Sequence, residues 1–154
     1  MRKDGALMGT AVVAGSAAVN AAHTVSHAGQ HLMSLPAWQL AYIVVVIYAA
    51  PVVAAVLLWT RYCLAGAWLL VASMAGSLVF EFLYHFLLPG SDNVFTQPPG
   101  AWRTAFGVSA VLLLPLQGMG CLAGLWAARV LSDGRARPVG SPAGQRRTPG
   151  RSHR

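Results

Sequence analysis

Three histidines recur at four-residue intervals in the segment HTVSHAGQH, which places His23, His27 and His31 along one face of a helix. A second polar stripe with the same spacing ends in Glu81 and His85, and Glu81 is the only acidic residue within the hydrophobic stretches of the chain. Imidazoles one helical turn apart, together with a carboxylate, are suited to binding one transition-metal ion. The spacing therefore predicts a metal site shared by two helices.

In this first interpretation the ion is Zn, Cu or Fe. Four ligands come from two helices, namely His27, His31, Glu81 and His85, and His23 is a fifth ligand or a hydrogen-bonding partner of the others. The carboxylate and histidine are four residues apart, not three as in the Glu-x-x-His pairs of di-metal helix bundles. The spacing leaves open whether such a site is catalytic, redox-active, ion-handling or structural.

Two other interpretations use the same residues. In an electron-transfer subunit, a haem would be bound by one histidine from each helix, for instance His27 and His85, although a carboxylate at Glu81 next to a ligand fits this poorly. Alternatively, Glu81 is paired with His23 or His27 in a buried polar network that fixes the helix packing or relays protons.

The elements that carry these residues are strongly apolar. The chain of 154 residues is 56% hydrophobic and 10% charged, against about 25% charged residues in soluble domains. Four hydrophobic stretches, at about 6–33, 37–60, 63–88 and 104–131, each exceed the ~20 residues that cross a bilayer as a helix. We therefore expect an all-α integral membrane protein, a four-helix up-and-down bundle whose main partner is the lipid bilayer.

The basic residues predict the orientation of these helices. Arg2 and Lys3 precede the first stretch, Arg61 lies in the second turn and further arginines follow the fourth stretch, whereas only Arg103 lies on the opposite side. The positive-inside rule then places both termini in the cytoplasm and the loop 89–103 outside. The bias towards alanine, glycine and arginine favours a bacterial genome, so we expect a multi-pass protein of the plasma membrane, of the bacterial inner-membrane type.

The chain divides into a transmembrane domain, residues 1–132, and a tail, residues 133–154, that is rich in Gly, Pro, Ser and Arg. Six of the eleven Lys and Arg residues fall after Ser132, so the net charge of +7 is mostly a property of the tail. We expect this tail to be disordered, and we expect no nucleic-acid partner because the basic residues lie on no soluble domain. Residues 1–22 also resemble a signal peptide, but the apolar character continues beyond them, which favours an uncleaved helix.

The helix ends predict how the two polar stripes align. The first and third stretches run in the same direction and each is followed by a proline. Counted back from these prolines, His31 lies level with His85, and His27 lies level with Glu81. Polar groups are costly in lipid, so the two stripes should face each other near the outer surface of the membrane.

The loop after the third stretch, PGSDNVFTQPPGAWR, is long for a connection between two spans. It offers Asp92 as an extra carboxylate for the site. We expect instead that Asp92 and Asn93 form an ordinary turn and bond to the backbone.

Small residues predict close packing between helices. Ala14, Ala18 and Ala22 repeat every four residues in the first stretch, and Gly120 and Gly124 do so in the fourth. Such faces let helix backbones approach each other, either within the chain or in a homo-oligomer.

Overall fold

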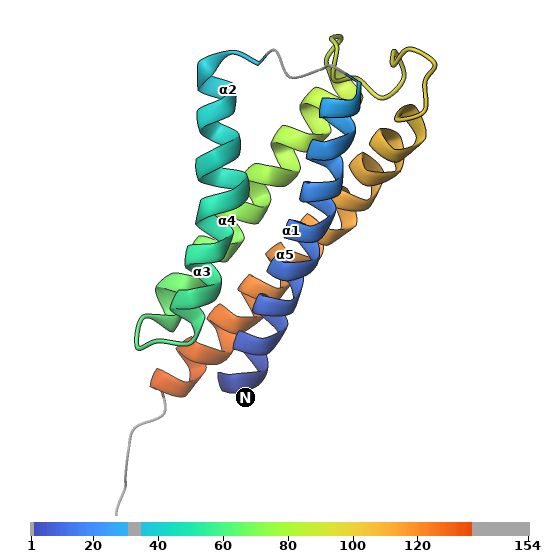
Figure 1. Ribbon diagram of the computed structural model, residues 1–154. Helices are drawn as coiled ribbons and strands as arrows, with labels where there is room; N and C mark the ends of the chain where they lie inside the picture. The colour runs from blue at the N-terminus through green and yellow to red at the C-terminus, as the bar shows by residue number, and fades with distance from the viewer. Residues whose placement is uncertain (1, 31–34, 137–154) are drawn as a thin grey trace, which may run out of the picture.

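The structure is a computed structural model that describes residues 2–30 and 35–136, and these two ranges contain helices and turns but no strand. The helices run side by side in one bundle (Figure 1). Four segments are long and apolar enough to cross a membrane: Lys3–Gly29, Ala37–Leu58, Cys63–Leu87 and Arg103–Asp133. Each of them overlaps one of the four hydrophobic stretches of the sequence, so the all-helical character of the fold is as expected.

The first helix, α1, comprises Arg2–Gly29. It begins four residues earlier than the expected stretch and ends sooner, while residues 31–34 lie outside the described ranges. The side chain of Trp102 packs against its end so closely that a β-carbon at Gly29 would lie 2.5 Å from the indole ring. Glycine therefore allows the chain before α5 to approach the end of α1.

The second span combines three elements: α2 (Ala37–Tyr42), the π-helical η1 (Ile43–Ala49) and α3 (Ala50–Leu58). The wide π turns come directly before Pro51, and the N–H of Ala50 donates to the carbonyl of Val45, five residues back. Proline has no N–H to donate, and the π turns rearrange the backbone bonds around it.

The third span consists of α4 (Cys63–Phe82) and the π-helical η2 (Leu83–Leu87), and the fourth is α5 (Arg103–Ala136). The N–H of Leu88 closes η2 by donating to the carbonyl of Leu83 at 2.7 Å. At the other end of the chain, α5 continues to Ala136, into the segment that we expected to be disordered. Residues 137–154, most of that predicted tail, lie outside the described ranges.

Helix α5 packs against both α1 and α4, and α3 packs against α4. A β-carbon at Gly124 would lie 2.9 Å from the carbonyl oxygen of Ala67 and 2.7 Å from the side chain of Val71. The backbones of α4 and α5 are therefore almost in contact at this point, as small residues allow. The apolar core lies at the end of the bundle that holds the N-terminus and includes Ala6, Ala54, Leu58, Ala67, Leu70, Met74 and Ala127.

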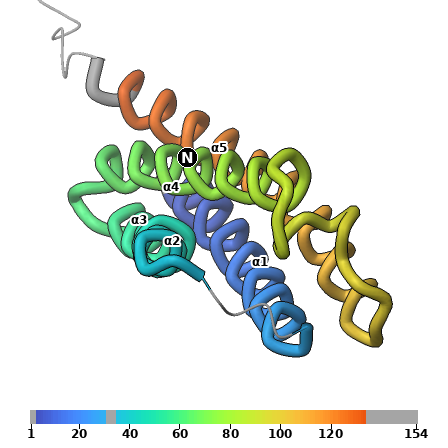
Figure 2. The backbone as a smooth tube through the Cα atoms, turned by 90° about the horizontal axis from the view of Figure 1, so that it is seen from above, coloured from blue at the N-terminus to red at the C-terminus, as the bar shows by residue number. Residues whose placement is uncertain are grey.

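The opposite end, which holds residues 88–102, is called the distal end below. There the second span stands apart from the first, because η1 packs on α4 whereas α1 packs on α3 and α5. Figures 1 and 2 both show α2 set away from α1. The helices are thus spread at the distal end and tightly packed at the other.

Large apolar side chains cover the outside of the bundle, and polar ones lie inside it. Val56 and Leu122 are 60% and 67% exposed, whereas Asn20, Ser77 and Glu81 are buried. A lipid environment favours large apolar side chains on the outside of a bundle and polar ones turned inwards.

Candidate metal centre

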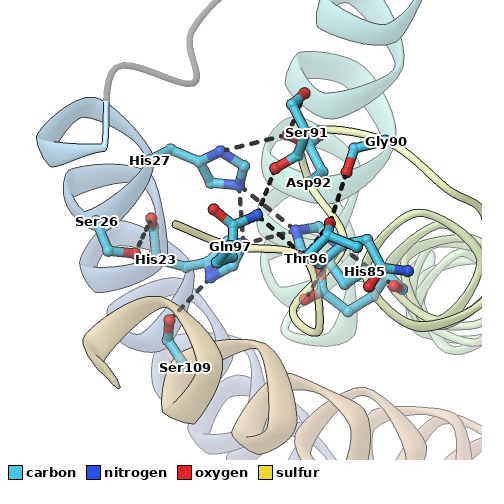
Figure 3. Close-up of polar contacts among 12 residues, drawn as sticks. His23, Ser26, His27, His85, Gly90, Ser91, Asp92, Thr96, Gln97 and Ser109 are labelled. Carbon is cyan, nitrogen blue, oxygen red and sulfur yellow. Dashed lines mark hydrogen bonds and ion pairs between the residues drawn. The ribbon is translucent and has the colours of Figure 1, made fainter. Parts of the chain in front are cut away.

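Three histidine side chains meet at the distal end of the bundle, His23 and His27 from α1 and His85 from η2 (Figure 3). Their Nε2 atoms form a small triangle. The sides are 2.9 Å between His23 and His85, 3.0 Å between His23 and His27, and 3.4 Å between His27 and His85. His23 and His85 are buried and His27 is partly buried, so the triangle lies inside the bundle.

The three Nε2 atoms cannot all be satisfied by hydrogen bonds to one another. Each Nε2 carries either a proton or a lone pair, so at least two of the three must be alike in any assignment of hydrogens. The two that are alike face each other at 3.4 Å or less and repel each other. A cation bound to three lone pairs removes this conflict.

The environment of His23 leaves a lone pair, rather than a proton, on its Nε2 atom. The hydroxyl of Ser109 donates its single proton to the carbonyl of Ala105 (2.7 Å) or Phe106 (2.9 Å). Its oxygen is then an acceptor for the Nδ1–H of His23, 2.8 Å away. With the proton of the neutral ring on Nδ1, Nε2 has a free lone pair and can bind a metal.

His85 is held in the same way by its own helix. Its Nδ1 lies 3.3 Å from the carbonyl oxygen of Glu81 and 3.6 Å from the carboxyl Oε1 of the same residue. Both are oxygen acceptors, so the ring proton belongs on Nδ1 and the lone pair on Nε2. The Nε2 atoms of His23 and His85 are therefore two lone-pair donors only 2.9 Å apart.

The loop between η2 and α5 brings a carboxylate to the third histidine. The Oδ1 of Asp92 lies 3.9 Å from the Nδ1 of His27, an ion-pair distance rather than a hydrogen bond. Burial raises the pKa of the Asp92 carboxyl above its ordinary value, and the nearby His27 lowers it in part. Each of the three histidines thus has an oxygen atom near its outer ring nitrogen, as metal-binding histidines usually do.

The loop that carries Asp92 is fixed by its own polar contacts. Asn93 donates from Nδ2 to the carbonyl of Leu88 (3.0 Å) and accepts at Oδ1 from the N–H of Phe95 (2.9 Å). Gln97 donates to the carbonyls of Ser91 and Asn93, and the N–H of Val94 donates to the carbonyl of His85 (2.9 Å). Asn93 therefore makes the turn that we expected, whereas Asp92 faces the histidine cluster.

An aromatic ring from α5 supports all three imidazoles. Phe106 is fully buried, and its ring centre lies 4.9 Å from that of His23, 4.8 Å from that of His27 and 5.5 Å from that of His85. It stacks on His23 with an interplanar angle of 30° and meets His27 edge-on at 79°. Such packing restricts the ring orientations and keeps water away from one side of the cluster.

The triangle matches the bond lengths of a transition metal. Its centre is about 1.8 Å from each Nε2, so an ion at the usual Zn–N distance of about 2.0–2.1 Å would sit roughly 1 Å out of their plane. All three ligands then lie on one side of the ion, which leaves its other side open. His23, His27 and His85 are thus a group that can hold a metal ion.

The structure places some of the predicted site residues in positions other than those expected. His23, expected as an accessory residue, lies at the centre of the cluster with His27 and His85. Glu81 is buried beside His85 but on the side of its outer nitrogen, away from the Nε2 triangle. His31 lies outside the described residues.

The relative depth of the helices also differs from the expected one by about one turn. His85 was expected level with His31, yet it meets His27 at 3.4 Å. The reason is the position of the helix ends. Because α1 ends at Gly29 and η2 at Leu87, His27 and His85 each lie two residues before the end of their helix.

Sequence reasoning missed the contribution of α5, namely Ser109 and Phe106. A single serine or phenylalanine in an apolar span carries no spacing signal of its own. The available signal was that Ser109 is a polar residue in the outer part of the fourth stretch, at a depth similar to that of the histidines.

Comparisons with protein-family models, with curated proteins and with solved structures find no match for this chain. The function of the protein is therefore inferred from the geometry of the site.

Proposed function

We propose that this is a metal-binding membrane protein in which His23, His27 and His85 bind one divalent transition-metal ion at the distal end of the bundle. The observation that carries the proposal is the Nε2 triangle, with sides of 2.9–3.4 Å, whose members cannot satisfy one another by hydrogen bonding. Three imidazoles suit Zn²⁺, Cu²⁺ or Fe²⁺. Three protein ligands leave a coordination position for a further molecule, as in catalytic zinc sites.

Glu81 and Asp92 act in this proposal through the histidines. Each carboxyl group lies near an outer ring nitrogen, Glu81 at 3.6 Å from His85 and Asp92 at 3.9 Å from His27. The carboxyl oxygens at these points orient the rings of His85 and His27.

A haem fits the site less well than a single ion. Two axial histidines bind haem iron from opposite faces of the macrocycle, so the flat ring has to pass between them. The Nε2 of His23 lies within 3.0 Å of the Nε2 atoms of both His27 and His85 and fills that space.

A polar network without a metal is the second candidate, and it is favoured by the buried pair of Glu81 and His85. Such a network would fix the packing of α1, α4 and α5 or relay a proton between the outer loop and the bundle interior. It does not explain why three imidazole nitrogens converge on one point.

We also propose that both termini lie in the cytoplasm and the distal end outside, in a plasma membrane of the bacterial type. The basic residues at both ends of the chain and at Arg61 support this orientation. The metal centre then lies near the outer face of the membrane.

Elemental analysis and an absorption spectrum of the detergent-purified protein test the proposal. We expect about one transition-metal ion per chain after incubation with Zn²⁺, Cu²⁺ or Fe²⁺ and removal of excess ion, and no haem Soret band. A protein that stays below about a tenth of an ion per chain with each metal, although folded, would support the polar network instead.

A further inference from the structure

A cavity of about 240 Å³ lies beside the metal centre, between α1, the α2–η1 segment and the α4–η2 segment. His23, His27 and His85 all line it, so the space adjoins the three proposed ligands directly. Phe106 contacts the three rings but is not part of the cavity wall. A molecule in this cavity would lie next to the open coordination position of the ion.

Besides the histidines, the cavity wall includes the polar side chains of Asn20, Thr24, Tyr48, Glu81 and Asp92. Glu81 lines it and is 3% exposed, and its Oε1 makes no hydrogen bond among the described residues. A buried acceptor without a donor is costly. Glu81 is a polar point of the wall separate from the open coordination position, because it lies at the outer nitrogen of His85.

Apolar side chains form the remaining wall, which reaches the outer side of the bundle. Leu40, Ile43 and Val44 from the second span line the cavity, and Leu40 and Val44 are 54% and 52% exposed. Towards the tightly packed end the cavity reaches Tyr48, whose hydroxyl bonds to Thr24 Oγ1 at 2.7 Å and to the carbonyl of Asn20 at 3.2 Å. Apart from these bonds of Tyr48, η1 packs mainly on α4, and the exposed wall residues Leu40 and Val44 place the opening beside the second span.

We propose that this cavity binds a membrane-dissolved alcohol or phenol, an apolar molecule with one hydroxyl group that enters between α1 and the α2–η1 segment from the lipid. The inference rests on the proposed metal site, because the hydroxyl oxygen takes the open coordination position of the ion. The volume is suitable for one substituted ring, because a dry cavity of about 150 Å³ holds a benzene. The substrate class of the metal centre is therefore lipid-soluble.

Titration of the Co²⁺-loaded full-length protein in detergent tests this inference, because the visible spectrum of Co²⁺ reports its ligands. We expect 4-butylphenol to change the spectrum with an apparent Kd at least tenfold below that of phenol. Butylbenzene, which has the apolar body without the hydroxyl, should compete with 4-butylphenol but leave the spectrum unchanged.

Two neighbouring residues of η1 provide a matched pair of variants. Val44 lines the cavity and Val45 does not, although both are about half exposed. Val44→Trp should weaken 4-butylphenol binding at least tenfold, and Val45→Trp should leave it unchanged. Ile47→Trp should also weaken binding, because it fills the cavity from a buried position. If Ile47→Trp does not fold, Val44→Trp alone tests whether 4-butylphenol binds in the cavity. All variants share one detergent, so partition of the phenol into micelles cancels in the comparison.

The outcomes separate this inference from the metal site itself. If the wild-type protein binds neither Co²⁺ nor any of Zn²⁺, Cu²⁺ and Fe²⁺, the proposed function fails and this inference fails with it. If Co²⁺ binds but 4-butylphenol leaves its spectrum unchanged, or binds no tighter than phenol, only the lipid-soluble substrate is overturned. Equal effects of Val44→Trp and Val45→Trp would likewise overturn the cavity as the binding site.

Discussion

Ser109 shows how a residue that does not touch the metal would determine whether the site can form. Its hydroxyl proton is used by the α5 backbone, so the oxygen accepts from the Nδ1–H of His23. That bond leaves a lone pair on the Nε2 atom that faces His27 and His85. The ligand character of His23 thus depends on a serine from another helix.

Replacing this serine should weaken the metal site without destroying the bundle. We expect Ser109→Ala to lower metal affinity by about 10- to 100-fold, the usual effect of removing a partner of a metal-binding histidine. Competition with a chelator of known affinity measures the change. Ser77→Ala is a matched control, because the Ser77 hydroxyl is buried and donates to the carbonyl of Ser73 in its own helix. Equal affinities of the two variants would argue against the role of Ser109.

Removing the central histidine tests the ligand set more severely. His23→Ala deletes one of three ligands, so we expect less than about a tenth of an ion per chain under conditions that saturate the wild type. Metal content after gel filtration provides the measurement. The control is His153→Ala, a histidine of the basic tail for which the sequence suggested no role. Retention of a full ion by His23→Ala would rule out a site centred on this residue.

The four-residue spacing was enough to predict which helix faces carry the cluster, and His27 and His85 do meet. It could not rank His23 above Glu81, because that ranking depends on side-chain direction and on the relative depth of two helices. Side-chain direction and relative depth depend on features without a periodic signal, such as the close approach of the Trp102 side chain to Gly29. Ser109 and Phe106 came from a third helix with no polar stripe at that depth.

The helices hold the site in place through contacts far from it. α4, which leads into the turn that carries His85, lies almost in backbone contact with α5 at Gly124, where a β-carbon would be 2.9 Å from the Ala67 carbonyl oxygen. α5 also packs along α1, which carries His23 and His27. The spacing of the three histidines therefore depends on close packing at the opposite end of the bundle.

A single methyl group should disturb this packing. We expect Gly124→Ala to lower the melting temperature in detergent by several degrees, because overpacking against backbone atoms costs about 1–3 kcal/mol. Gly118→Ala is the control, since a β-carbon at Gly118 meets nothing within 4 Å, and alanine favours helix over glycine. The same melting temperature for both variants would contradict the close approach of α4 and α5.

Long apolar runs made the four helices predictable, because a bilayer leaves a spanning segment few alternatives. The π-helical turns were not predictable in this way. η1 precedes Pro51 and η2 contains His85, and each adds a wide turn that shifts the side chains around the helix axis. Such local shifts decide which side chains meet, yet they leave the hydrophobic pattern unchanged.

The whole molecule has its described ends at one side and its histidine cluster at the other (Figure 1). If the basic ends are cytoplasmic, Ser91 in the distal loop faces outwards and Thr60 in the second turn faces inwards. In a background lacking Cys63 and Cys121, Ser91→Cys should react with a membrane-impermeant maleimide in intact cells. Thr60→Cys should react only after permeabilisation, and the reverse pattern would invert the proposed orientation.

The small-residue faces differ in what they contact. Gly120 and Gly124 pack against α4 of the same chain, whereas Ala14, Ala18 and Ala22 are exposed on α1. The first face is therefore used within the chain. A homo-oligomer through the α1 face stays a prediction.

X-ray absorption spectroscopy of the Zn²⁺-loaded, full-length protein tests the proposed metal centre most directly, because it counts and identifies the ligands of the ion. We expect three imidazole nitrogens at about 2.0–2.1 Å, and two after His85→Ala if that variant retains the ion. A spectrum of the wild-type protein with fewer than three imidazoles, or with sulfur at about 2.3 Å, would contradict a centre formed by His23, His27 and His85.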